Sequence, residues 1–74
     1  MEIKKVNYKT FDVFVGKGWK FWVRIEAIKD KLDVNKIHAR IVNFNSESLN
    51  EFDAKKVMIS FLNLKFSGKN HVFN

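Results

Sequence analysis

The sequence contains no cysteine and no proline, and only three of its 74 residues are glycine. Without cysteine the chain can form neither a disulfide framework nor a cysteine-based zinc site. Small secreted domains usually depend on disulfides, so this absence favours a reducing cytoplasm. No apolar run approaches the roughly 18 residues needed to cross a bilayer. The charged start of the chain, residues 1–5, also lacks the apolar segment of a signal peptide. The sequence therefore predicts a cytoplasmic protein with no membrane association.

The aromatic content is high for so short a chain. Eight Phe, two Trp and one Tyr are present, and each aromatic side chain removes about 150–250 Å² from water when it is buried. A chain of this length lies near the lower limit for a core that is stable without disulfides or metals. We therefore expect one small domain, residues 1–74, with a two-layer core built largely from these rings.

Positive charge exceeds negative charge. Fourteen Lys and Arg stand against eight Asp and Glu, a formal net charge of +6, which attracts polyanions. Arg24 and Arg40 are the only arginines, so the chain is better suited to holding phosphates than to reading base edges. The alternative is a generally basic protein with no anionic partner. Abundant Lys, Asn, Phe and Ile also indicate an AT-rich genome, that of a bacteriophage or an AT-rich bacterium. If the protein is encoded by a phage, we expect it to act in the host cytoplasm.

Three segments alternate apolar and polar residues with the period of a β-strand. Residues 10–15 and 19–28 flank a turn, Gly16-Lys17-Gly18, and so predict a hairpin. Residues 36–45 predict a third antiparallel strand, and residues 3–8 are expected to extend the first.

A helix is expected after the third strand. Ser48-Leu49-Asn50-Glu51 fits a capping box, and a helix over residues 49–64 places Phe52, Ile59 and Leu62 towards one side. Residues 57–66 are apolar enough to form a strand instead, and residues 71–73 fit an edge strand or a tail. The predicted fold is α+β: a three- to four-stranded antiparallel sheet with one helix on one face (β-β-β-α).

The helix can cover only one face of this sheet, and the other face carries the functional hypothesis. Aromatic rings with cations between them suit single-stranded nucleic acid, because bases stack on the rings and cations neutralise phosphates. Lys17, at the hairpin tip, could reach a further phosphate. The alternatives are a second small core beneath a terminal segment and a protein interface. The predicted outward-facing residues are Phe14, Lys20, Trp22, Arg24, His38, Arg40 and Phe44, with Asp12 and Glu26 between them.

Two segments resemble nucleic-acid-binding families. Lys17-Gly18-Trp19-Lys20-Phe21-Trp22-Val23 resembles the Lys-Gly-aromatic-small-aromatic signature of RNA-recognition-motif and cold-shock domains, with Lys20 where those families have a small residue. Three strands followed by a helix carrying Ala54-Lys55-Lys56 resemble the C-terminal part of double-stranded-RNA-binding domains, whose N-terminal helix is missing here. The second resemblance implies that Lys55 and Lys56 hold phosphates near the helix N-terminus. The alternative is a solvated helix face.

Signatures of catalysis are scarce. His38 and His71 share no ligand spacing, three scattered glycines cannot form a phosphate loop, and no nucleophile lies beside a positioned base. We therefore expect no metal, no cofactor and no catalytic activity. Residues 68–73 resemble in part the Gly-x-His strand of HicA-type ribonuclease toxins, which implies a small His-dependent ribonuclease as a further alternative.

The sequence thus predicts a small basic protein that binds RNA or single-stranded DNA, with steep salt dependence and little sequence preference. The main alternative is a phage-type inhibitor of a host or toxin protein, in which the same aromatics anchor the interface and RNA can be part of the assembly. Open sheet edges would also permit a homodimer.

Overall fold

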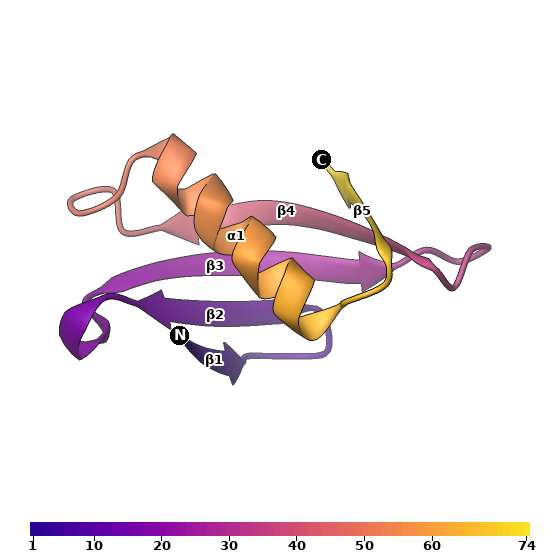
Figure 1. The fold of residues 1–74 in the computed structure, drawn as a ribbon, viewed down its shortest axis with the longest axis horizontal. Helices are drawn as coiled ribbons and strands as arrows, with labels where there is room; N and C mark the ends of the chain where they lie inside the picture. Colours follow the sequence, from indigo (N-terminus) through magenta and orange to yellow (C-terminus); the bar gives the residue numbers. More distant parts are fainter.

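The computed structural model describes all 74 residues as a five-stranded sheet crossed on one face by a single α-helix (Figure 1). The strands lie in the order β1-β2-β3-β4-β5. Neighbouring strands are antiparallel except β4 and β5, which are parallel. The predicted α+β class with one helix on the sheet is confirmed, but the sheet has five strands and is mixed. The elements are β1 Glu2–Lys5, β2 Thr10–Val15, the 3-10 helix η1 Lys17–Trp19, β3 Phe21–Lys29, β4 Lys36–Phe44, α1 Glu51–Lys65 and β5 Asn70–Phe73.

Strand β1 is a separate edge strand and not an extension of β2. The side chain of Asn7 accepts hydrogen bonds from the backbone amides of Lys9, at 3.0 Å, and Thr10, at 2.9 Å. Such a side-chain bond to residues further along the chain stabilises a turn. The chain therefore reverses after β1, and Ile3 lies opposite Val13 in an antiparallel pair.

The predicted hairpin of β2 and β3 is present, but its turn is longer than expected. Gly16 and Gly18 have φ values of 83° and 72°, and Trp19 has a φ of 53°. A Cβ atom on Gly16 would lie 2.5 Å from the ring of Phe21, so only glycine fits there. Because η1 extends to Trp19, β3 begins at Phe21, and Trp19 and Lys20 lie outside the strand.

Residues 57–65 are helical, which resolves the helix-or-strand alternative in favour of the helix. The buried side chains of α1 are Ala54, Met58, Phe61 and Leu62. Their spacing is that of one apolar stripe along a helix. The predicted side of the helix is mostly wrong, because Phe52 is 66% and Ile59 is 43% exposed and only Leu62 is buried.

The helix also begins later than predicted. Asn50 is the N-cap, and its side-chain oxygen accepts a hydrogen bond from the amide of Asp53 at 2.8 Å. The predicted capping box from Ser48 is therefore wrong. Asn competes well with Ser at this position because its short side chain reaches the same free amide.

The core lies between α1 and the sheet and is wholly apolar. Eleven residues are buried, and none of them is polar or charged. Three rings meet near the C-terminal end of α1: Phe61 lies 5.1 Å from Phe11 and 6.0 Å from Phe66, between ring centroids. This cluster fixes the end of the helix against β2.

An irregularity in β4 places Phe44 on the face opposite to the one predicted. Ile41 pairs with Ile25, but Asn43 pairs with Arg24, so Val42 is an extra residue in β4. A bulge of this kind shifts the alternation of side chains by one residue. Phe44 therefore lies opposite Val23 and packs against the core beneath α1.

No helix in the structure combines the length and the apolar character that a transmembrane span requires.

Candidate functional site

The structure brings five of the predicted site residues onto the sheet face that α1 leaves uncovered, here called the open face. They are Phe14, Trp22, Arg24, His38 and Arg40. Phe14 and Trp22 are direct cross-strand partners and are both partly buried. They form an aromatic pair at the hairpin end of the open face.

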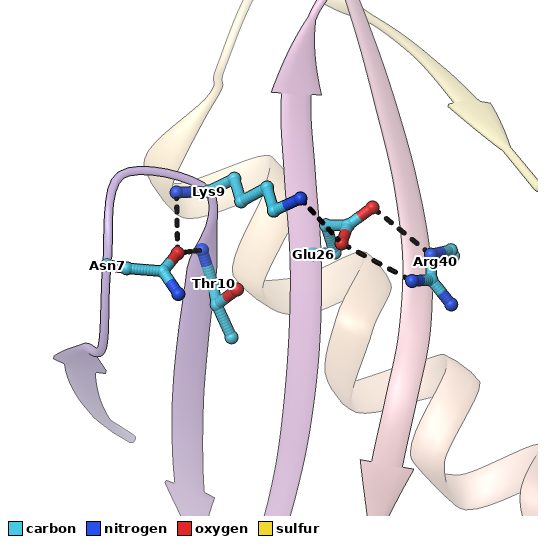
Figure 2. A network of polar contacts seen from close by, with 5 residues as sticks. All are labelled: Asn7, Lys9, Thr10, Glu26 and Arg40. Carbon is cyan, nitrogen blue, oxygen red and sulfur yellow. Dashed lines mark hydrogen bonds and ion pairs between the residues drawn. The ribbon is translucent and has the colours of Figure 1, made fainter.

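Both arginines of the open face are bound by carboxylates. Arg24 donates two hydrogen bonds to Asp12, at 2.7 and 2.9 Å, and Arg40 donates two to Glu26, at 3.1 and 3.3 Å. Lys9 approaches the same Glu26 carboxylate at 3.7 Å, and Figure 2 shows Glu26 between the two cations. The hydrogen bond to Asp12 raises the pKa of Arg24, and the hydrogen bond from Arg40 lowers the pKa of Glu26.

His38 is also paired. Its Nε2 lies 2.7 Å from one carboxylate oxygen of Asp30, while the other oxygen accepts from the amides of Leu32 and Asp33, each at 2.9 Å. The hydrogen bond with His38, followed by the two amides, lowers the pKa of Asp30 to about 2. Asp30 therefore joins the loop after β3 to the open face of β4.

These pairs make the open face nearly neutral. Its charged strand residues are the cations Lys4, Arg24, Lys36 and Arg40 and the anions Glu2, Asp12 and Glu26. The face that the sequence predicts to be basic thus carries little of the net charge of +6.

The other predicted cations lie elsewhere. Lys17 and Lys20 are at the hairpin turn, while Lys55 and Lys56 are on α1. Lys55 lies 3.6 Å from Glu51, and the ammonium of Lys56 lies 4.4 Å from the ring centroid of Phe52. Together with the inward position of Phe44, this means that the ten predicted site residues do not form one surface.

A different group of cations surrounds a pocket where the end of α1 meets the ends of β1, β2 and β3. This pocket, here called the basic pocket, has a volume of about 460 Å³. Four lysines and three aromatic rings line it, and none of its lining residues is acidic. The lining residues are Lys5, Tyr8, Lys9, Phe11, Ala27, Ile28, Lys29, Lys65 and Phe66.

The lysines of the basic pocket lie close to its rings. The ammonium groups of Lys5 and Lys65 are each 5.9 Å from the ring centroid of Phe11. The ammonium of Lys9 is 5.8 Å from the ring centroid of Tyr8. Lys9 is paired with Glu26, but Lys5, Lys29 and Lys65 have no carboxylate within 4.0 Å. Three lysines without a carboxylate partner therefore line one pocket.

The C-terminus of α1 opposes this positive charge only in part. A helix C-terminus carries about half a negative charge, concentrated on its last carbonyl groups. Here the carbonyl of Phe66 accepts a hydrogen bond from the amide of Lys69 at 3.2 Å, and Nε2 of His71 lies 3.0 Å from the same oxygen. Lys65 adds a full positive charge in the last turn. All of the charged side chains that line the pocket are cationic.

The residues of the basic pocket are dispersed along the sequence. Lys5, Tyr8 and Lys9 lie at the start of the chain, Lys29 ends β3, and Lys65 ends α1. No local motif links these segments, because the pairing of β1, β2 and β3 brings the strand ends together and the crossing of α1 over the sheet adds the end of the helix (Figure 1). The only local signal was a lysine in the last turn of the helix, which is common for stability alone.

A second cavity lies beside the free edge of β4. Strand β5 covers only Lys36–Ala39 of β4, so the edge beyond Ala39 has no neighbouring strand. Next to this edge runs a groove of about 630 Å³ with an apolar majority in its lining, which includes Ile41, Phe44, Met58, Ile59 and Phe73. Its charged lining residues are one anion, Glu51, and one cation, Lys55.

The two histidines lie on opposite faces of the sheet. His38 is on the open face, whereas His71 pairs with the buried Ile37 and faces α1. No three His, Asp or Glu side chains gather closely enough to hold a metal ion. Comparison of the chain with protein-family models, with curated proteins and with solved structures finds no match.

Proposed function

We propose that this protein binds single-stranded nucleic acid, RNA or DNA, in the cytoplasm, and that the basic pocket is the centre of its binding surface. The observation that carries the proposal is the convergence of four lysines and three aromatic rings, with no acidic lining residue. Phosphates are attracted to the lysines, and bases can stack on an exposed ring. The protein acts as a binding module without catalysis of its own.

The distribution of paired and unpaired cations supports this location. Of the fourteen cations, Lys9, Arg24, Arg40 and Lys55 take part in ion pairs with carboxylates. The remaining ten are all lysines without a carboxylate partner, and of these Lys69 donates a hydrogen bond to the carbonyl of Val34 at 3.0 Å. An unpaired ammonium contributes more to polyanion binding than a paired one, because no intramolecular bond has to be broken first.

The exposed ring favours a single strand over a duplex. Tyr8 is 78% exposed beside the pocket. In a duplex the faces of the bases are covered by their neighbours, whereas an unstacked base can lie against a protein ring. Each such contact contributes about 1–3 kcal/mol.

The test is a salt titration of binding to short labelled single strands, followed by fluorescence anisotropy. The variant Lys29→Gln/Lys65→Gln removes two pocket cations, and Lys55→Gln/Lys56→Gln removes two helix cations as a control with the same net charge. Each lost phosphate contact reduces the slope of log K against log salt by about 0.7. We expect the pocket variant to lose about 1.4 from the slope and the control to change little. Absence of binding by the unmodified protein would contradict the proposed function.

Trp22→Ala tests the open face separately. Because the open face is nearly neutral, we expect this variant to keep its affinity for single strands within about twofold, a difference of under about 0.5 kcal/mol. A tenfold loss of affinity in a folded variant would show that single strands bind the aromatic pair of the open face and not the basic pocket.

A protein partner is the second candidate function, and the groove beside β4 favours it. An unpaired strand edge offers backbone hydrogen bonds to an extended segment, and the adjoining apolar groove offers a place for its side chains. This is the surface that an inhibitor of a host or toxin protein, or a second copy of the chain, would use. A pull-down with and without nuclease separates the candidates, since a partner retained after nuclease and high salt is held by protein contacts.

A further inference from the structure

We infer that the basic pocket receives a phosphorylated terminus: a nucleoside bearing a terminal phosphomonoester, either at the end of a strand or as a free nucleotide. This inference rests on the proposed function and specifies which part of a nucleic acid the pocket holds. It is carried by the charge of the pocket, its size and the arrangement of its rings.

The pocket lysines carry more positive charge than a single internal phosphodiester can neutralise. Lys5, Lys29 and Lys65 are unpaired, and Lys9 shares its carboxylate, Glu26, with Arg40. An internal phosphodiester carries one negative charge, whereas a terminal phosphate carries about 1.5 to 2 at neutral pH and offers three acceptor oxygens. A terminal phosphate, and still more a diphosphate, therefore balances the converging ammonium groups better.

Lysine is the appropriate residue for such a group. Its ammonium is a compact point charge with three donors on a flexible stem, so several lysines can adjust to one phosphate. The pocket has no arginine in its lining, and the two arginines are held on the open face by carboxylates. The arrangement thus fits recognition of charge density and not of a planar base edge.

The rings provide a place for the nucleoside. Phe11 is only 3% exposed and forms the floor, while Tyr8 is 78% exposed at the rim. Phe11 is fixed by Phe61 at 5.1 Å and by Phe66 at 6.2 Å. The floor is therefore rigid, and Tyr8 is free to turn its ring towards a base. The volume of about 460 Å³ is on the scale of a small-molecule site and suits a single nucleotide.

The first experiment compares short labelled strands of one sequence that differ only at their ends: 5′-phosphate, 3′-phosphate or hydroxyl at both ends. We expect a phosphorylated end to bind about tenfold more tightly, the effect of one additional charge-assisted contact. Equal affinity for all three strands would overturn the inference while leaving the proposed function intact. If no strand binds, the proposed function itself is wrong.

The second experiment distinguishes a strand end from a free nucleotide. Adenosine, AMP and ADP are titrated into the isotope-labelled protein, and NMR shifts of the amides around Lys29 and Lys65 are followed. We expect affinity to rise in the order adenosine, AMP, ADP, with shifts confined to the basic pocket. If AMP and ADP shift these amides no more than adenosine does, but the phosphorylated strand binds more tightly, the ligand is a strand end and not a free nucleotide. If neither the nucleotides nor the phosphorylated strand shows a preference, the inference is wrong.

Matched variants assign the effect to the pocket. Lys29→Gln/Lys65→Gln is expected to abolish the preference for a phosphorylated end, whereas Lys55→Gln/Lys56→Gln should retain it. Tyr8→Ala should preserve the preference for a phosphorylated end but lower the affinity for every strand about fivefold, which corresponds to the lower end of the contribution of a base–ring stack. Because all five side chains are exposed, each variant should remain folded, which circular dichroism checks. A preference that survives in Lys29→Gln/Lys65→Gln would place phosphate recognition elsewhere.

Discussion

The open face of the sheet and the basic pocket contain the same kinds of side chain, aromatic rings and long cations, but they differ in how their charges are compensated. On the open face both arginines have a carboxylate on a neighbouring strand. In the basic pocket three of the four lysines have none. Composition alone therefore does not identify a polyanion-binding surface; the supply of counter-charges decides it.

Strand register explains the difference. Asp12 lies directly opposite Arg24, and Glu26 lies opposite Arg40, in antiparallel pairs that hold opposite charges at contact distance. The pocket lysines come from the ends of elements, and the strand residues opposite them, Phe11 for Lys5 and Ile37 for Lys29, are apolar and supply no counter-charge. Regular pairing thus neutralises the middle of the sheet and leaves its end positive.

The largest expected effect is on the free energy of unfolding, and it should differ between two phenylalanines on opposite faces of β2. Phe11 is 3% exposed beneath the basic pocket, and Phe14 is partly buried on the open face. We expect Phe11→Ala to lower the free energy of unfolding by about 3–5 kcal/mol and Phe14→Ala by about 1–2 kcal/mol, as for partial burial. Urea denaturation followed by circular dichroism measures both. Equal losses would mean that the open face holds a second core.

Removal of the carboxylates that pair with the arginines should make the open face resemble the basic pocket in its binding of single strands. Asp12→Asn/Glu26→Gln frees both arginines and Lys9, and three new phosphate contacts should steepen the salt slope of single-strand binding by about 2.1. Fluorescence anisotropy at several salt concentrations gives the slope. Glu47→Gln/Asp53→Asn makes the same change in net charge away from the sheet without releasing a paired cation and should alter the slope little. If both variants behave alike, net charge matters and local pairing does not.

The smallest expected effect concerns acid stability of the open face. The pKa of Asp30 is lowered from 3.8 to about 2. A carboxyl with a depressed pKa contributes stability above its unfolded pKa, and that contribution is lost as pH falls through the folded pKa. We expect Asp30→Asn to lower Tm by roughly a few degrees at neutral pH and to differ less from the unmodified protein near pH 2. If the difference in Tm between Asp30→Asn and the unmodified protein is the same at both pH values, the charge of the Asp30 carboxylate does not contribute to stability.

The sequence predicts the fold wherever local patterns determine it. The alternation of β2 and β3 around Gly16 predicted the hairpin, whereas of the residues predicted to share one side of α1 only Leu62 is buried. Phe44 was misplaced because the bulge at Val42 depends on pairing with β3, which no single strand reveals. The N-cap was assigned to Ser48 because Asn50 offers an equivalent side chain two residues later.

The candidate site was less accessible to sequence reasoning than the fold. Phe14, Trp22, Arg24 and Arg40 were placed on one face correctly, since strict alternation fixes this through β2 and β3. Their ion pairs depend on register, which hairpin length determines only once the turn is known. The basic pocket depends on where α1 ends above the sheet, and that is a property of packing.

The parallel pairing of β5 with β4 has a consequence for how the chain folds. Each antiparallel pair joins strands that are neighbours in the sequence, so these contacts can form early. Strand β5 reaches β4 only after the chain has passed through the whole of α1 (Figure 1). We therefore expect the hydrogen bonds between β4 and β5 to form last during folding and to break first during unfolding. Loss of these bonds would expose the edge of β4 to solvent.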